Sequence, residues 1–161
     1  MKSDMSSTVV IKLQADEFQA LHPLALRAMS DSPYRHRVFG VLTQMGVNKH
    51  PSPDSANAIA AFYHLAMMLA QGHVSATKKM TVGEVTFPKP AVCLLAALIL
   101  STKVAEARKM DEFNVGFKAE ALIRATESLS SQMSDSLQGW LNFGEKEAVN
   151  FIMPSGSNTI N

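Results

Sequence analysis

The sequence predicts a mainly α-helical protein: a compact bundle of about six short helices with a minor β strand or hairpin element. Apolar residues recur at helical spacing along most of the chain, and prolines and glycines divide it into short segments. Hydrophobic residues make up 47% of the 161 residues and charged residues only 18%, which excludes intrinsic disorder and allows one core to form. We expect a single helical domain over 1–153 and a flexible C-terminal arm over 154–161.

The first element that we expect is a short strand over 8–13, because β-branched residues there alternate between two faces. A helical pattern begins at Ala15. Pro23 should end or bend that helix after His22, because proline lacks the amide hydrogen that a helix interior needs. This part of the chain therefore predicts either two short helices or one bent helix.

Two further helices follow. Ser32 is the predicted N-cap of a helix over 33–46, with Pro33 at its first position. The loop over 51–54 supplies the next cap, and an apolar stripe at helical spacing then ends at Gly72. The stripe consists of Ile59, Phe62, Ala66 and Leu69.

The middle of the chain combines β-forming residues with the most apolar segment. Residues 80–87 predict a type II′ hairpin that turns at Gly83 and Glu84 and that can join the first strand in a small sheet. A helix over about 90–110 follows, and its first half is apolar on most sides. We expect this helix at the centre of the core.

The last third predicts a helix, one more short helix and a weaker helical turn over 145–153. Asn114 caps the first of these helices. Its apolar positions are Leu122, Ala125, Leu129 and Met133. The short helix is marked by Leu137, Trp140 and Leu141, which anchor either the core or a neighbouring subunit and are the candidate subunit-interface residues.

Charges are distributed unevenly although the net charge is only +1. Residues 27–110 carry ten basic and four acidic side chains, whereas residues 111–161 carry three basic and seven acidic ones. Such asymmetry suits the binding of a polyanion, or contact between the basic face of one copy and the acidic face of the next. The alternative is that both faces are simply solvated.

No catalytic or cofactor-binding motif occurs in the sequence. The phosphate-binding loops G-x-x-x-x-G-K-[ST] and G-x-G-x-x-G are absent, as are the H-E-x-x-H zinc motif and the G-x-S-x-G nucleophile elbow. Cys93, the single cysteine, can form no internal disulfide, and burial in its apolar run would make the thiol inert. We therefore expect no metal and no cofactor.

The expected location is cytoplasmic, or inside an intracellular assembly or virion. No secretory signal opens the chain, and the longest apolar run, over 91–100, is shorter than the roughly 20 residues of a membrane-spanning helix. A single thiol also suits a reducing compartment. These features predict a protein that is not secreted and has no membrane partner.

A basic cluster at the start of the helix over 33–46 is the candidate nucleic-acid site. Arginine binds phosphate in bidentate fashion, an aromatic ring can stack on a base, and a helix amino end is partly positive. Basic residues of nearby loops can extend this surface, although such residues are common and the pI of 7.9 lies below that of dedicated binders. The candidate nucleic-acid-binding residues are Tyr34, Arg35, His36, Arg37, Lys49, Lys78 and Lys79.

Three hypotheses for function result. The first is a non-enzymatic assembly protein, either coat- or nucleocapsid-like or a small helical subunit of a ribonucleoprotein complex, that forms homo-oligomers and contacts RNA or single-stranded nucleic acid without sequence preference. The alternative is a helical adaptor or regulatory protein that binds another protein and no nucleic acid. An enzymatic role would depend on His36, His64 and His73.

Overall fold

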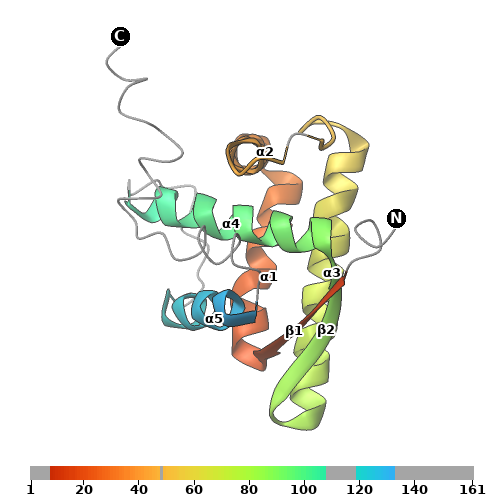
Figure 1. Cartoon of the computed structure of the whole chain (residues 1–161), viewed down its shortest axis with the longest axis vertical. Coiled ribbons are helices and arrows are strands. Elements are labelled where there is room, and N and C mark those ends of the chain that lie inside the picture. Colours follow the sequence, from red (N-terminus) through yellow and green to blue (C-terminus); the bar gives the residue numbers. More distant parts are fainter. Residues whose placement is uncertain (1–7, 48, 108–118, 133–161) are drawn as a thin grey trace.

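The computed structural model in Figure 1 describes residues 8–47, 49–107 and 119–132, which form five helices and two strands. The fold is mainly helical with a small antiparallel sheet, as the sequence predicts. The helices expected at Leu137–Leu141 and over 145–153, and the arm over 154–161, lie outside the described residues. The elements are β1 (Thr8–Gln14), α1 (Ala15–Ser30), α2 (Ser32–Gln44), α3 (Ala56–Lys79), β2 (Val82–Pro88), α4 (Lys89–Ala107) and α5 (Ala119–Gln132).

Helix α1 continues through Pro23 as one helix, so of the two alternatives that of two short helices is wrong. Its start is fixed by Glu17, whose carboxylate accepts a hydrogen bond of 2.9 Å from the Gln14 amide. Proline removes one backbone hydrogen bond, but α1 packs along α3 and buries Phe18, Leu21 and other residues of one face. Burial of this face holds the helix together across the proline.

Helix α3 does not end at Gly72 but extends to Lys79, which corrects the expected boundary. A Cβ atom at position 72 would overlap the ring of Phe18 on α1. Gly72 is therefore needed where the two helices approach closely, and it does not terminate α3. The helix ends instead at Met80, the residue at which the backbone turns left-handed, with φ of 56°.

Residues 82–88 form one strand, so the expected hairpin at Gly83 and Glu84 is wrong. Strand β2 pairs antiparallel with β1, and Leu13 lies opposite Gly83. A Cβ atom on Gly83 would overlap the backbone of α3 at Gly72 and Ala76. Close packing of β2 on α3 thus explains this glycine, and the expected pairing with the first strand is confirmed.

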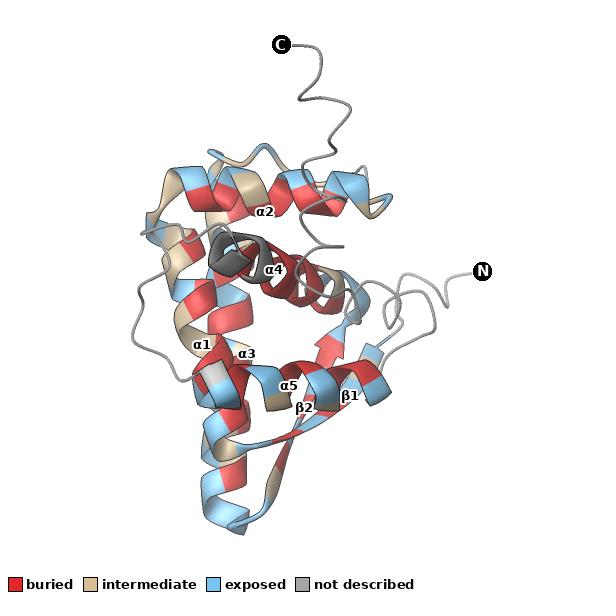
Figure 2. Ribbon diagram, turned by 90° about the vertical axis from the view of Figure 1, so that its left-hand side faces the viewer, coloured by how far each residue is buried: buried red, intermediate tan, exposed pale blue. Residues whose placement is uncertain are grey.

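Helix α4 is the central helix that the sequence predicts. The side chains from Leu95 to Leu100 are at most 1% exposed. Figure 2 shows buried residues along α4 and on the sides of α2 and α5 that face it. Within the described residues, none of the helices combines the length and the hydropathy that a bilayer crossing requires.

Helix α5 is attached at both ends. Near its start, Arg124 donates to the carboxylates of Asp16 and Glu17 on α1. At its end, the Gln132 side chain accepts from the Lys12 amide at 2.7 Å and donates to the Lys12 carbonyl at 2.8 Å. Gln132 therefore continues the hydrogen bonding of β1 on the edge away from β2.

Candidate functional site

The basic cluster begins at the junction of α1 and α2. Asp31, not the expected Ser32, is the N-cap of α2, and its carboxylate accepts from the Tyr34 amide at 3.1 Å. The same carboxylate accepts from Arg27 at 2.9 Å. Burial opposes ionisation of Asp31, but these hydrogen bonds outweigh it and lower its pKa. The Asp31 side chain is thus held in place as the N-cap of α2.

Tyr34 lies in the core and is fully buried. Its hydroxyl is 3.4 Å from the Thr102 hydroxyl, which donates its own hydrogen to the Leu98 carbonyl at 2.8 Å. Tyr34 is therefore the donor to Thr102. Burial raises the pKa of the phenol well above its usual value. A ring in this position anchors α2 on α4 and is not available to stack on a base.

Arg35 is also buried, with 6% of its surface exposed. Its guanidinium donates to the carbonyls of Ala28 and Met29, each at 3.0 Å, which are in the last turn of α1. It further donates to the Pro53 carbonyl and to Asp54 at 3.3 Å. Arg35 therefore caps α1 and fastens the loop before α3, and each of its three nitrogens donates within the chain.

The remaining members of the predicted cluster are more accessible but dispersed. His36 is about half exposed and lies 2.9 Å from Asp54, whose pKa is lowered by hydrogen bonds from His36 and Ser32. Arg37 is partly buried on the same helix. The structure therefore does not present the α2 cluster as one open phosphate site.

The lysines of the predicted site lie at opposite ends of α3. Lys49 precedes the helix, whereas Lys78 and Lys79 are in its last turn. A helix of 24 residues is about 36 Å long. Figure 1 shows α2 beside the beginning of α3 and the start of β2 at its far end. One chain therefore does not gather the three lysines, although all three are exposed.

The histidines proposed for an enzymatic role are not brought together. His73 lines a small cavity of about 220 Å³ with His22, a residue that sequence reasoning did not single out. Burial, together with the neighbouring His73, lowers the pKa of His22. Among the described residues no group of three potential metal ligands is present.

An exposed apolar stripe runs along the outer face of α3. Tyr63, Met67 and Val74 are 44–52% exposed, although large apolar side chains favour the interior. Three alanines on the same face of α3 are exposed as well. The alternating spacing of four and three residues is that of a coiled-coil seam. The stripe, called the α3 seam below, consists of Ala56, Ala60, Tyr63, Met67, Ala70 and Val74.

Sequence reasoning missed the α3 seam because it ended the helix at Gly72, so that Val74 fell outside the helix. The seam was nevertheless visible in the sequence. Between Ala56 and Thr77 the helix contains no Asp, Glu, Lys or Arg. A solvated helix face normally carries such residues, so this uncharged segment predicts a covered face.

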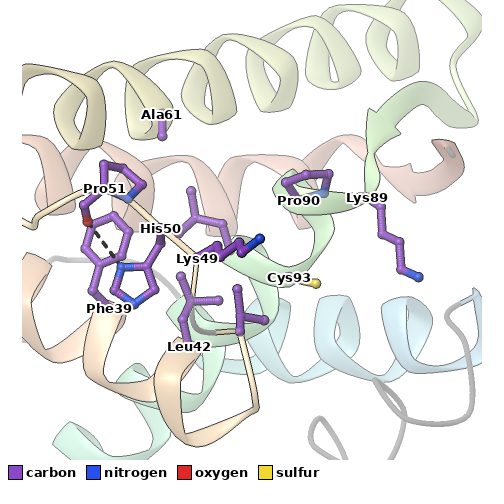
Figure 3. A pocket seen from close by; sticks show the side chains of 11 residues that line it. Phe39, Leu42, Lys49, His50, Pro51, Ala61, Lys89, Pro90 and Cys93 are labelled. Carbon is purple, nitrogen blue, oxygen red and sulfur yellow. Dashed lines mark hydrogen bonds between the residues drawn. The ribbon is translucent and has the colours of Figure 1, made fainter. Parts of the chain in front are cut away.

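A second hollow lies among α2, α3, the loop that joins them, and the beginning of α4. Its volume is about 460 Å³. Figure 3 shows Lys49, His50 and Cys93 around it. Burial raises the pKa of the Cys93 thiol, but Cys93 is only partly buried and not enclosed in the core as the sequence predicts. The lining residues are Phe39, Leu42, Val47, Lys49, His50, Pro51, Ala61, Lys89, Pro90, Cys93 and Leu94.

The candidate subunit-interface residues Leu137, Trp140 and Leu141 lie outside the described residues. Comparison with known protein families, curated proteins and solved structures found no match to this chain.

Proposed function

We propose that this chain is a non-enzymatic structural protein that self-associates through the α3 seam and, once assembled, contacts nucleic-acid phosphates. The observation that carries the proposal is the seam itself: an exposed apolar stripe along a helix of more than six turns, in a segment without charged residues. Scattered apolar residues are normal on a surface, but a continuous series marks a contact.

The features of the seam favour a second copy of the same chain as its partner. Identical faces repel each other when they carry like charges, and the segment from Ala56 to Thr77 carries no charged residue. The alanines at 56, 60 and 70 allow two helices to approach closely, while Tyr63 and Met67 fill the space between them. The result is a self-complementary, two-fold interface.

We place the two α3 helices antiparallel. Their dipoles then attract, because the positive amino end of each helix lies beside the negative carboxyl end of the other. This orientation also brings Lys78 and Lys79 of one copy to the end of α3 at which Lys49 of the other copy lies. Pairing thus supports the second part of the proposal, since it gathers exposed lysines that one chain keeps apart.

Light scattering coupled to size-exclusion chromatography tests self-association. The wild type should elute as a dimer or larger assembly at micromolar concentration. Met67→Glu places two carboxylates in the seam and should give the 17.5 kDa monomer with unchanged circular dichroism. Ile123→Glu is the matched control, because Ile123 is an exposed apolar residue, 58% accessible, on α5. A monomeric wild type overturns the proposal and favours the adaptor hypothesis.

Cysteine cross-linking tests the orientation in a Cys93→Ser background. Ala60→Cys and Ala70→Cys occupy corresponding places on either side of the seam centre. Antiparallel helices should form a mixed disulfide between the cysteines at positions 60 and 70 when the two variants are combined and oxidised with air. Cross-links within each variant alone would show parallel helices and contradict the proposed arrangement.

Binding of a labelled poly(U) oligonucleotide tests the contact with nucleic acid. Affinity should fall steeply between 50 and 300 mM salt, because lysine contacts release counterions from phosphates. The double variant Lys78→Gln and Lys79→Gln should weaken binding and flatten the salt dependence, whereas it should leave the mass unchanged. Equal affinity of the wild type and the double variant for poly(U) would contradict the proposed contact with nucleic acid. It would not affect the proposal of self-association.

A further inference from the structure

We propose that the hollow among α2, α3 and α4 binds a free straight-chain carboxylate, with its alkyl chain inside and its carboxylate on Lys49. The volume of about 460 Å³ is within the range of small-molecule sites, roughly 300–1,000 Å³. This inference does not depend on self-association, since the pocket and the α3 seam involve different faces of α3.

The interior of the pocket suits hydrocarbon. Its walls come from three helices and a loop and are mostly aliphatic or aromatic, with Phe39, Leu42 and Leu94 among them. Among the described residues that line it there is no Asn, Gln, Ser, Thr or acidic side chain. A ligand with polar groups along its length would leave them without hydrogen bonds there. An unbranched alkyl chain meets no such penalty and gains from burial.

His50 belongs to the wall rather than to the ligand contacts. Its Nδ1 donates to the Pro51 carbonyl at 3.1 Å, and its Nε2 lies 3.0 Å from the Thr43 hydroxyl. Its ring packs on that of Phe39 with centroids 5.0 Å apart. Both ring nitrogens are therefore engaged by α2 and by the loop that follows it.

Lys49 supplies the charge at the mouth of the pocket. In Figure 3 its side chain extends toward Pro90 and Cys93, while Lys89 lies at the other end of the group. None of the ion pairs formed among the described residues uses Lys49. The amino end of α4 is at the same pocket and adds positive potential. No acidic side chain is among the described lining residues, so Lys49 selects an anionic head group.

Calorimetric titration with the C8, C10 and C12 carboxylates, each below its micelle concentration, tests the proposal. Affinity should rise about fourfold for each added methylene, the gain expected for burying one such group. Lys49→Gln should weaken carboxylate binding about tenfold, the effect of losing one charge-assisted hydrogen bond, and should leave the matching alcohols unaffected. Lys79→Gln, which changes a lysine far from the pocket, is the control.

Cys93 provides an independent readout, because it is the only thiol and lines the pocket. Saturating C12 carboxylate should slow its reaction with a maleimide. Ala61→Phe fills the pocket from α3 and should abolish both binding and protection. Affinity that does not depend on chain length, equal losses in Lys49→Gln and Lys79→Gln, or an unprotected Cys93 would each overturn the inference.

Discussion

Two helical glycines of this protein should respond in opposite ways to alanine. At Gly72 a Cβ atom would overlap the Phe18 ring, which is fully buried and has little room to move. Gly40 on α2 has no atom within 4 Å of a built Cβ. We expect Gly72→Ala to lower the free energy of unfolding by about 1–3 kcal/mol, as overpacked cores do. Gly40→Ala should raise it by about 0.5–1 kcal/mol.

Urea denaturation of the two variants, followed by circular dichroism, measures this difference. The two substitutions are chemically identical and both lie inside helices, so helix propensity alone predicts the same stabilisation for both. A stable Gly72→Ala variant would therefore show that α1 and α3 do not approach as closely as the structure has them.

At the scale of elements, the contact of α5 with α1 should make stability depend on pH. The hydrogen bond from Arg124 lowers the pKa of Asp16 below its usual value of 3.8. The contact therefore stabilises the fold above pH 3.8, and this contribution is lost as the pH falls through the lowered pKa of the folded state. Both side chains are partly exposed, so solvent and salt reduce the effect.

Arg124→Gln should thus lower the urea midpoint at pH 6, and its difference from the wild type should vanish toward pH 2. Asp16→Asn supplies the control. In that background the substitution of Arg124 should have a smaller effect at pH 6, with Glu17 as the remaining acidic partner. An Arg124→Gln effect that stays constant from pH 6 to pH 2 would contradict the ion pair.

Periodicity predicted the helices well, because it reflects which face is buried. Phe62, Ala66 and Leu69 do face inward on α3, whereas Ile59 is only partly buried. The errors at Gly72 and Gly83 share one cause. Glycine marks a turn when the chain itself needs a positive φ, but it also marks close packing when another element occupies the place of its Cβ atom. The two kinds of glycine differ only in whether another element packs against the glycine, and that element is distant in sequence.

The candidate site was less predictable for the same reason. Tyr34 and Arg35 follow a capped helix start, a pattern that suits phosphate binding and capping of a neighbouring helix equally well. The choice depends on where the last carbonyls of α1 lie, and the structure directs them at Arg35. The apolar spacing of the α3 seam, in contrast, is legible in the sequence once the full length of α3 is known.

At the scale of the whole molecule, β1 joins the amino end of the chain to its middle. Ile11 is fully buried opposite Val85, whereas the adjacent Val10 is 48% exposed. Ile11→Ala should lower the free energy of unfolding by about 2–5 kcal/mol, because it leaves a cavity in the core. Val10→Ala should change it by less than about 1 kcal/mol. Thermal unfolding of both variants checks this, and similar losses would contradict the strand register.

The pairing of β1 with β2 also determines when the sheet can form during synthesis on the ribosome. Pro88, the last residue of β2, follows Gln14 by 74 residues. At about 5–20 residues per second, a ribosome needs roughly 4–15 s to make that interval. Until then the β-branched residues of β1 have no partner strand, and α1, α2 and the whole of α3 are made first. The nascent chain therefore carries an aggregation-prone edge for seconds, and the core is completed later still, because Ala125 and Leu129 of α5 belong to it.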